Sequence, residues 1–286
     1  MKLHAAMFCM LIAASHAGLA EEVSISEIIY YNGTIAGQEI AMSLEFIGSN
    51  VAGGYVYKKY KKPIDVTGEY KGKKLNLAEL HDGAVAANIH AIKKDAAFEG
   101  TWQDEKTYYF RVKPASKSYK DLIKSIAPSE TGITIYFKNG LNQEIDADTL
   151  ADSLSITFED FTFDGYPDIR ILELEGGGNS SYIYYGYDPG TLQYVKSVSE
   201  INDLVNPLVI HSKKLLSGFI KDGCCSYSVV TIDEHQIRRA EYNYVLGTGK
   251  ERITDKFSKK VVERSISKEG FEVDYFSFVQ KKGSLQ

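Results

Sequence analysis

Short runs of alternating apolar and polar residues, separated by glycines, are the feature that most constrains the fold of this chain. In the first half they fall at residues 25–31, 38–46, 54–58, 74–80, 85–92 and 107–112. A period of two is typical of half-buried β-strands. Glycine permits the positive φ that tight connections need, so we expect turns at Asn32-Gly33, Ala52–Gly54 and Lys71–Lys73. The spacing predicts an antiparallel meander.

The composition favours the same class and excludes one class of partner. The 286 residues include 20 tyrosines and 13 phenylalanines but only one tryptophan and six prolines. Aromatic residues of this kind suit pleated, half-buried surfaces, so a mostly β fold is expected. The net charge of -5 leaves no broad basic face for phosphate neutralisation, and we expect no nucleic-acid partner.

Residues 1–20 have the pattern of a secretory signal peptide. A short basic start precedes an apolar run at residues 5–14, and small residues follow up to Ala20. This order predicts cleavage before Glu21. The apolar run is too short to span a bilayer. We therefore expect a periplasmic or secreted protein without a membrane span.

A change of composition divides the rest of the chain. Between Pro114 and Gly132 the alternation gives way to Ser, Lys and Pro, and strand-like runs resume at Ile133. Such a break is typical of a connection between modules. We predict an N-terminal β module at residues 21–115, a linker at 116–131 and a second β domain at 132–286.

Only two cysteines, Cys224 and Cys225, follow the predicted leader, and they are adjacent. Long-range disulfides within the mature chain are thereby excluded. In an oxidising compartment the pair can close a vicinal disulfide, or both can remain thiols at a turn. The sequence leaves both alternatives open.

The stretch at residues 158–169 has the spacing of a calcium-binding loop. Counted from Asp160, oxygen-bearing side chains stand at the first, third and fifth positions, and Gly165 is the sixth, where the backbone must turn sharply. The predicted oxygen donors are Asp160, Thr162, Asp164, Tyr166 (through its carbonyl group) and Asp168. Three carboxylates this close repel one another without a cation. We predict a structural Ca²⁺ ion.

Two observations limit this interpretation. The twelfth position, where an EF-hand has a bidentate glutamate, is Ile171, and the flanking residues have strand character rather than helix character. The loop is therefore not an EF-hand. An Asp-Gly turn with solvated carboxylates is the alternative.

Several segments of the second half together resemble a known family. They are residues 160–168, which we call the aspartate loop, the tyrosine-rich run at 182–188, Leu204 with Asn206-Pro207, and the run Gly223–Tyr227. Over roughly residues 133–246 the chain resembles the calcium-binding periplasmic immunity proteins that protect bacteria against peptidoglycan-hydrolase effectors of bacterium-killing type IV secretion. That family is similar to the periplasmic inhibitors of invertebrate-type lysozyme.

The resemblance implies a β-propeller-like or sandwich C-terminal domain, which would carry the ion in the aspartate loop. It also implies inhibition through an exposed loop that enters a muramidase cleft. In such inhibitors the loop carries a Ser-Gly pair and a nearby tyrosine. Here the pair is Ser217-Gly218. No tyrosine follows it up to position 221, which is Lys221, and the nearest tyrosine is Tyr227.

Two other classes of function were weighed. The chain has no Gly-x-Ser-x-Gly, His-Glu-x-x-His or Gly-Lys-Ser/Thr motif, so we expect it not to be an enzyme. An envelope glycan-binding module is the alternative, with Tyr182, Tyr184 and Tyr185 as the stacking residues. Exposed tyrosines would favour glycan binding, and a protruding loop near Tyr227 would favour inhibition. We predict an inhibitor or immunity protein against a lysozyme-like peptidoglycan hydrolase.

Overall fold

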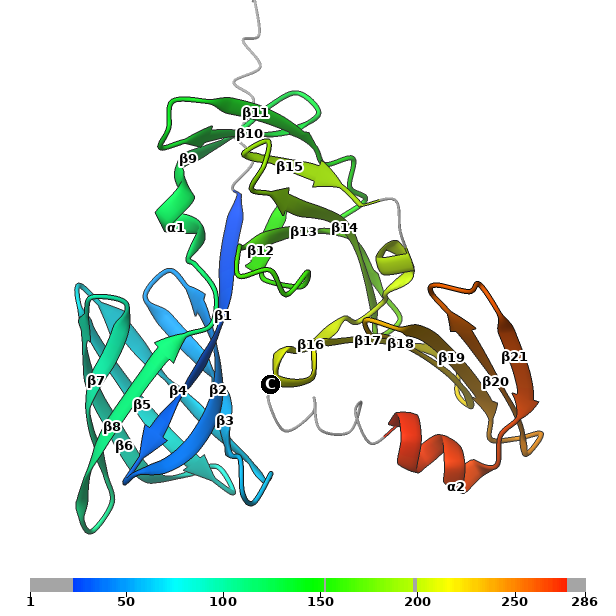
Figure 1. The fold of residues 1–286 in the computed structure, drawn as a ribbon, viewed down its shortest axis with the longest axis horizontal. Helices are drawn as coiled ribbons and strands as arrows, with labels where there is room; N and C mark the ends of the chain where they lie inside the picture. Colours follow the sequence, from blue (N-terminus) through cyan, green and yellow to red (C-terminus); the bar gives the residue numbers. More distant parts are fainter. Residues whose placement is uncertain (1–22, 152, 198–199, 277–286) are drawn as a thin grey trace, which may run out of the picture.

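The computed structural model describes residues 23–151, 153–197 and 200–276. The predicted leader, residues 1–20, lies outside this range. The mostly β class and the antiparallel meander are confirmed. Figure 1 shows a barrel, a group of sheets above it and a curved sheet beside it. The structure does not confirm a propeller or a sandwich.

The N-terminal module is an eight-stranded barrel. Each strand pairs antiparallel with the next, and β1 also pairs with β8, which closes the barrel. The strands are β1 (Ser24–Ile35), β2 (Gln38–Ile47), β3 (Asn50–Tyr57), β4 (Pro63–Lys71), β5 (Lys74–His81), β6 (Ala84–Lys94), β7 (Ala97–Gln103) and β8 (Thr107–Pro114).

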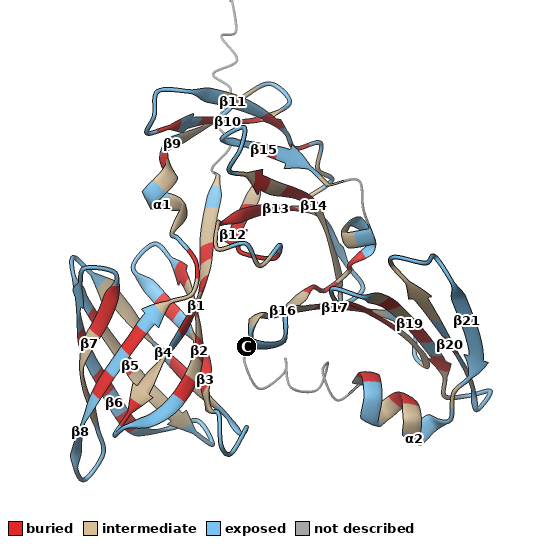
Figure 2. Cartoon of the chain, in the orientation of Figure 1, coloured by how far each residue is buried: buried red, intermediate tan, exposed pale blue. Residues whose placement is uncertain are grey.

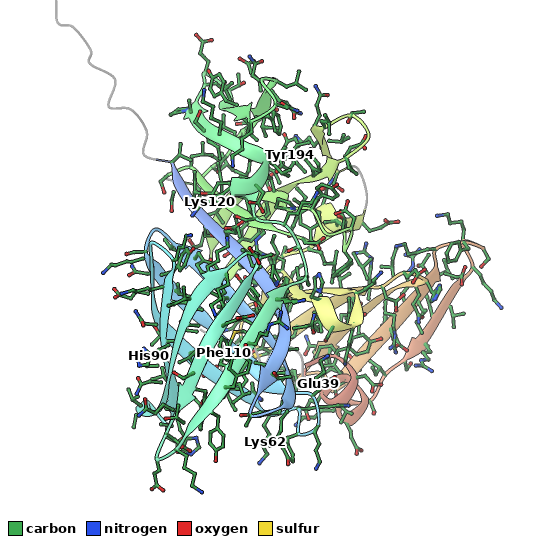
Figure 3. The ribbon with its side chains drawn as sticks, turned by 60° about the vertical axis from the view of Figure 1, so that its left-hand side comes forward. Glu39, Lys62, His90, Phe110, Lys120 and Tyr194 are labelled. Atoms are coloured by element: carbon green, nitrogen blue, oxygen red, sulfur yellow. A yellow bond between two sulfur atoms is a disulfide. The ribbon has the colours of Figure 1, made fainter. Side chains whose placement is uncertain are left out.

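Alternate residues of these strands fill the barrel interior. Buried and exposed positions alternate along the strands in Figure 2, as the period of two requires. Ile40, Leu75 and Phe110 are fully buried there, and Phe110 is labelled on the barrel in Figure 3. Side chains therefore occupy the interior as a packed core.

Two of the predicted turns are wrong. Asn32-Gly33 lies inside β1, and Ala52–Gly54 lies inside β3. A Cβ atom on Gly33 would lie 1.9 Å from the carbonyl oxygen of Arg111 on β8. These glycines are needed because backbones approach closely inside the strands. The turn at Lys71–Lys73 is confirmed, because Gly72 connects β4 to β5 with a φ of +63°.

Strand β1 also belongs to a second sheet. Its first residues pair in parallel with β12, while its last residues pair with β8. Strands β12 to β15 continue this sheet as an antiparallel series. Their bounds are β12 (Ser155–Glu159), β13 (Asp168–Gly176), β14 (Asn179–Asp188) and β15 (Gln193–Lys196).

The segment predicted as a linker, 116–131, carries regular structure. It contains helix α1 (Tyr119–Leu122), capped by the Ser118 side chain, and strand β9 (Ile123–Pro128). Strand β9 pairs with β10 (Gly132–Phe137), which pairs with β11 (Asn142–Asp146). The buried Ile123 packs in the same cluster as Phe158 of β12. The segment is therefore part of the folded core.

The C-terminal part is a six-stranded antiparallel sheet with a short helical segment packed against it. The 3₁₀ turn η1 (Glu200–Asp203) leads into it, and a second turn, η2 (His211–Lys213), follows its first strand. Its other elements are β16 (Leu208–Ile210), β17 (Leu215–Asp222), β18 (Ser226–Ile232), β19 (Gln236–Asn243), β20 (Thr248–Asp255), β21 (Val261–Ser265), α2 (Lys268–Phe271) and η3 (Glu272–Phe276).

A buried carboxylate fixes this last segment to the sheet. Glu251 of β20 is 1% exposed and accepts hydrogen bonds from the Arg264 side chain, the Tyr275 hydroxyl and Arg238 Nη2 (2.8 Å). Burial raises its pKa, but these three donors outweigh burial and lower the pKa of Glu251 to about 2. A buried charge kept ionised in this way needs all of its partners.

The close approach at Gly33 gives a first prediction. Gly33→Ala should lower the free energy of unfolding by about 2 kcal/mol, a typical cost of overpacking, because the new methyl group must separate β1 from β8. Urea unfolding followed by Trp102 fluorescence measures this. Gly176→Ala is the matched control, since a Cβ there meets no described atom within 4 Å. An equal loss of unfolding free energy in Gly33→Ala and Gly176→Ala would contradict a close approach at Gly33.

The Glu251 network gives a second prediction. The folded pKa is about 2, against 4.5 as the ordinary value, so the network's stabilisation is complete above pH 4.5 and is lost as the pH falls towards 2. Glu251→Gln should reduce the free energy of unfolding by about 3 kcal/mol at pH 7, and the difference from the wild type should shrink by pH 2. Chemical unfolding at several pH values tests this; a difference independent of pH would contradict it.

Candidate functional site

The aspartate loop connects β12 to β13 and folds around its own carboxylates. Asp160 is 1% exposed. Its Oδ1 accepts the N–H of Asp164 and its Oδ2 the N–H of Gly165, each at 3.1 Å. The structure places the sharp turn at Gly165, where φ is +87°. The loop therefore turns as the calcium-loop spacing requires.

The other two carboxylates of the loop differ in their surroundings. Asp164 Oδ1 accepts the N–H of Tyr166 (2.8 Å), and burial raises the pKa of Asp164. Asp168 is completely buried. Its Oδ2 accepts the N–H groups of Phe161 and Thr162, and its Oδ1 accepts that of Tyr187 (2.9 Å). Burial raises the pKa of Asp168 to about 7, although these N–H groups favour the charged form.

The donor set can be compared with the needs of a hard cation. Asp160, Asp164 and Thr162 supply oxygens from one short loop, as Ca²⁺ prefers. Asp160 Oδ1 and Asp164 Oδ1 each accept one N–H and retain a second lone pair. Asp168 is held inside the core by three N–H groups, so it fits a supporting role better than a direct one. No group of three or more His, Cys, Asp or Glu side chains among the described residues forms a metal cluster.

The Tyr166 side chain does not face the carboxylates of the loop. Its ring stacks on that of Tyr187 at 5.2 Å between centroids, and the Lys117 ammonium lies 4.0 Å from the centre of the Tyr166 ring. Only the backbone carbonyl of Tyr166, the atom named in the sequence prediction, is relevant to a cation.

A histidine that the sequence analysis did not select contacts the loop. His211 of η2 has its Nε2 3.2 Å from Asp160 Oδ2, and its ring stacks on Tyr30 of β1 at 4.8 Å. The ring also meets Phe163 edge-on at 5.7 Å. The aspartate loop is therefore clamped between the shared strand β1 and the start of the C-terminal sheet.

A buried ionic network lies directly beside this clamp. The Tyr30 hydroxyl donates to Glu159, and Arg170 Nη1 lies 3.0 Å from Glu159 Oε2. Glu159 is 3% exposed, and burial raises the pKa of Tyr30 well above its usual value. The Arg170 guanidinium also lies over the Tyr182 ring at 5.2 Å. The network joins β1, β12, β13 and β14.

The predicted inhibitory residues do not form an exposed loop. Ser217 and Gly218 lie inside β17, and Ser217 is 3% exposed. A Cβ on Gly218 would lie 2.8 Å from the carbonyl oxygen of Val205. Tyr227 lies in β18, half-buried, with its ring 5.8 Å from that of Tyr244. Strand packing accounts for all three residues.

An exposed turn between β17 and β18 directly precedes Tyr227 in the chain. Cys224 and Cys225 form a vicinal disulfide in this turn, so the structure selects the first of the two alternatives for this pair. Lys221, Asp222, Gly223 and Cys224 are all exposed. We call residues 221–225 the disulfide turn.

Neighbouring residues hold the base of the disulfide turn in place. Asn179 Nδ2 donates to the Lys221 carbonyl and Asn179 Oδ1 accepts the Lys221 N–H, both at 3.0 Å. Asn206 in turn accepts from the N–H of Ser180 at 3.0 Å and donates to the carbonyl group of Phe219 at 3.1 Å. The turn between β13 and β14 thus supports the disulfide turn from the side.

The tyrosines proposed as a glycan-binding row are mainly core residues. Tyr184 and Tyr185 are 2% and 5% exposed, and Tyr182 is half-buried. The hydroxyl of Tyr184 donates to the Leu204 carbonyl, and that of Tyr185 to the Asp146 carbonyl. These side chains form no exposed stacking surface.

No family model, curated protein or solved structure matches the chain. The resemblance to immunity proteins therefore rests on the residues quoted for it. None of the helices in the described part of the chain is long and apolar enough to cross a membrane.

The aspartate loop gives a third prediction. Ca²⁺ at 10 mM should stabilise the protein by about 1.5–3 kcal/mol if the dissociation constant is in the extracellular range of about 10⁻⁴–10⁻³ M. Asp164→Ala should abolish the rise in melting temperature that Ca²⁺ produces.

The control is Asp148→Ala, which removes an exposed aspartate outside the loop and should leave the response to Ca²⁺ intact. An equal Ca²⁺ response in the wild type and in Asp164→Ala would exclude this loop as the ion site.

Proposed function

We propose that this protein is an exported, non-enzymatic inhibitor that protects its producer against a peptidoglycan hydrolase of the lysozyme type. The disulfide turn is the element that enters the target's cleft. The kinship with periplasmic immunity proteins, the periplasmic or secreted location and the structural Ca²⁺ ion belong to the same proposal.

The observation that carries the proposal is the combination of exposure and rigidity in the disulfide turn. Four of its five residues are exposed, the disulfide closes its tip, and Asn179 brackets Lys221 through two hydrogen bonds. A loop that is already ordered loses little conformational entropy when it binds. It is therefore better suited to blocking a cleft than the buried pair Ser217-Gly218.

Lys221 of the disulfide turn suits a glycosidase cleft, and the exposed Asp222 lies beside it. Such enzymes carry two carboxyl groups on either side of the scissile bond. The Lys221 side chain is exposed at the turn, and its ammonium group can pair with those carboxylates. The acidic balance of the whole chain, -5, would attract a basic enzyme over a longer range.

The aspartate loop has a supporting role in this mechanism. It ends at Asp168, where β13 begins, and β13 leads through its turn to Asn179 at the start of β14. An ion that orders the loop would therefore stiffen the hairpin that carries Asn179. Ca²⁺ acts in this proposal through the position of Lys221 and takes no part in a reaction.

The fourth prediction tests the disulfide turn. The wild-type protein should inhibit at least one member of a panel of muramidases, and Lys221→Ala should raise the inhibition constant about tenfold or more, as is typical for an interfacial charge pair. Hydrolysis of peptidoglycan followed by turbidity measures both.

Lys124→Ala, which removes an exposed lysine of β9, is the matched control and should inhibit like the wild type. Absence of inhibition of every panel member would overturn the proposed function. Inhibition that is equally strong in Lys221→Ala and in the wild type would overturn the assignment of the disulfide turn.

A further inference from the structure

The free end of the barrel carries a group of aromatic side chains that the proposed inhibition does not use. This end is formed by the turns that follow β1, β3, β5 and β7. In Figure 3 Glu39 and Lys62 mark it, on the side of the barrel away from Lys120. We call this end the barrel mouth.

The aromatic side chains of the mouth form a connected series around one carboxylate. Glu79 Oε2 accepts the Tyr55 hydroxyl at 2.6 Å and Trp102 Nε1 at 2.7 Å. On one side the rings of Tyr55 and Tyr57 lie 5.6 Å apart, and those of Tyr57 and Tyr60 lie 6.2 Å apart. On the other side Trp102 lies 5.8 Å from Tyr108.

A local irregularity in the barrel positions Glu79. Glu79 pairs with Ala87 and Leu80 pairs with Val85, which leaves Ala86 as an extra residue in β6. Such bulges occur at barrel rims, where they redirect a side chain. Glu79 lies two residues after the buried Leu77, on the inward face of β5. The bulge thus stands where a carboxylate faces the barrel interior.

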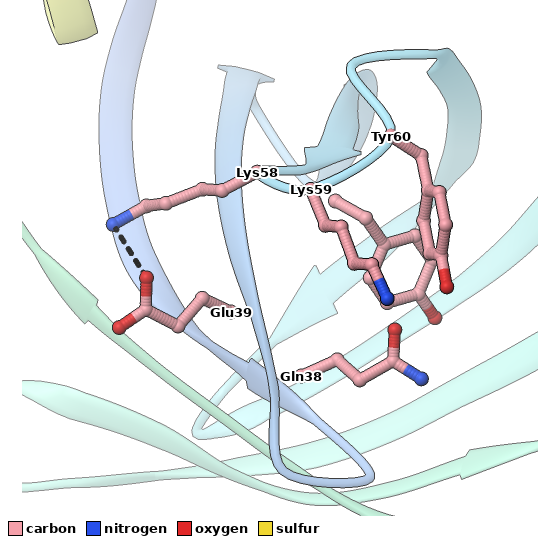
Figure 4. Close-up of a pocket in the computed structure, with 6 residues that line it drawn as sticks. Gln38, Glu39, Lys58, Lys59 and Tyr60 are labelled. Atoms are coloured by element: carbon pink, nitrogen blue, oxygen red, sulfur yellow. Dashed lines mark ion pairs between the residues drawn. The ribbon is translucent and has the colours of Figure 1, made fainter.

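A cavity of about 320 Å³ opens beside this series. Figure 4 shows Gln38, Lys59 and Tyr60 converging on it, while Glu39 and Lys58 pair at 3.6 Å on the other side. The volume is at the lower end of the range for ligand pockets and suits one or two sugar rings. Below the mouth the barrel is filled by its own core, so a long acyl chain has no room there.

The chemistry of the mouth suits a sugar. Ring faces such as those of Tyr57 and Tyr60 can pack against the apolar C–H face of a pyranose. The Gln38 amide and the Lys59 ammonium line the cavity and can bind its hydroxyl groups. The one carboxylate of the lining, Glu39, is paired with Lys58. A cationic ligand would meet Lys58 and Lys59.

We propose that the barrel mouth is a binding site for an oligosaccharide, with Tyr57 and Tyr60 as the stacking residues and Gln38 and Lys59 as hydroxyl partners. The site is separate from the disulfide turn. Binding there would hold the protein on a glycan while leaving Lys221 accessible.

Trp102, the only tryptophan in the chain, reports on the aromatic series, because it shares Glu79 with Tyr55, whose ring packs against that of Tyr57. The probes are the β-1,4-linked tetramers of N-acetylglucosamine and of glucose, added to the mature wild-type protein while Trp102 emission is recorded. We expect a saturable change with at least one tetramer. The two probes distinguish an N-acetylated glycan from a plain glucan.

Tyr60→Ala should weaken this binding about tenfold, as is typical for loss of an aromatic anchor. Tyr109→Ala is the matched control: both tyrosines are 57% exposed, but Tyr109 neighbours the buried Phe110 on β8 and so lies on the outer face of the barrel. It should bind like the wild type. Circular dichroism of both variants verifies their folding.

Two outcomes would overturn the site: no response to either tetramer, or equal affinity in Tyr60→Ala and Tyr109→Ala. Neither of them affects the muramidase assay, so failure of this site and failure of the proposed inhibition are distinguishable.

Discussion

The pairing of one strand with two different sheets holds this molecule together. Strand β1 gives its C-terminal half to the barrel, where it pairs with β8, and its N-terminal half to the upper sheet, where it pairs in parallel with β12. The side chain of Tyr30, between the two regions, donates to Glu159 and stacks on His211. The barrel, the upper sheet and the start of the C-terminal sheet thus meet at β1. Any change that shifts this strand alters all three.

The strands of the barrel were largely predictable from the sequence, but its closure was not. Period-two alternation located β1, β2, β5, β6 and β8, and part of β3. Strands β4 and β7 were not predicted, because each contains a glycine, a residue that usually interrupts a strand. A Cβ on Gly68 or Gly100 would lie 2.0 Å from a carbonyl oxygen of the neighbouring strand. Close approach of backbones depends on which strands pair, and the local pattern does not contain that information.

The candidate site was also predictable only in part. The turn of the aspartate loop followed from its spacing, because Asp160 bonds to N–H groups only four and five residues ahead. His211 contacts Asp160, which is 51 positions away in the sequence, and Glu159 contacts Tyr30, which is 129 positions away. No local motif marks either contact. Ser217-Gly218 was assigned to an inhibitory loop from a resemblance, whereas pairing along β17 buries Ser217. The adjacent cysteines left two alternatives, and the structure shows the vicinal disulfide.

The parallel pair of β1 and β12 has a consequence for the order of folding. The Ser26 hydroxyl donates to the Thr157 hydroxyl at 3.0 Å across 131 residues of sequence. Contacts of such high sequence separation form slowly, because a long loop must close first. The barrel can close once β8 is available, but the first residues of β1 then present an unpaired edge until β12 arrives. Until then this edge can pair with a wrong strand, because its N–H and C=O groups are unsatisfied.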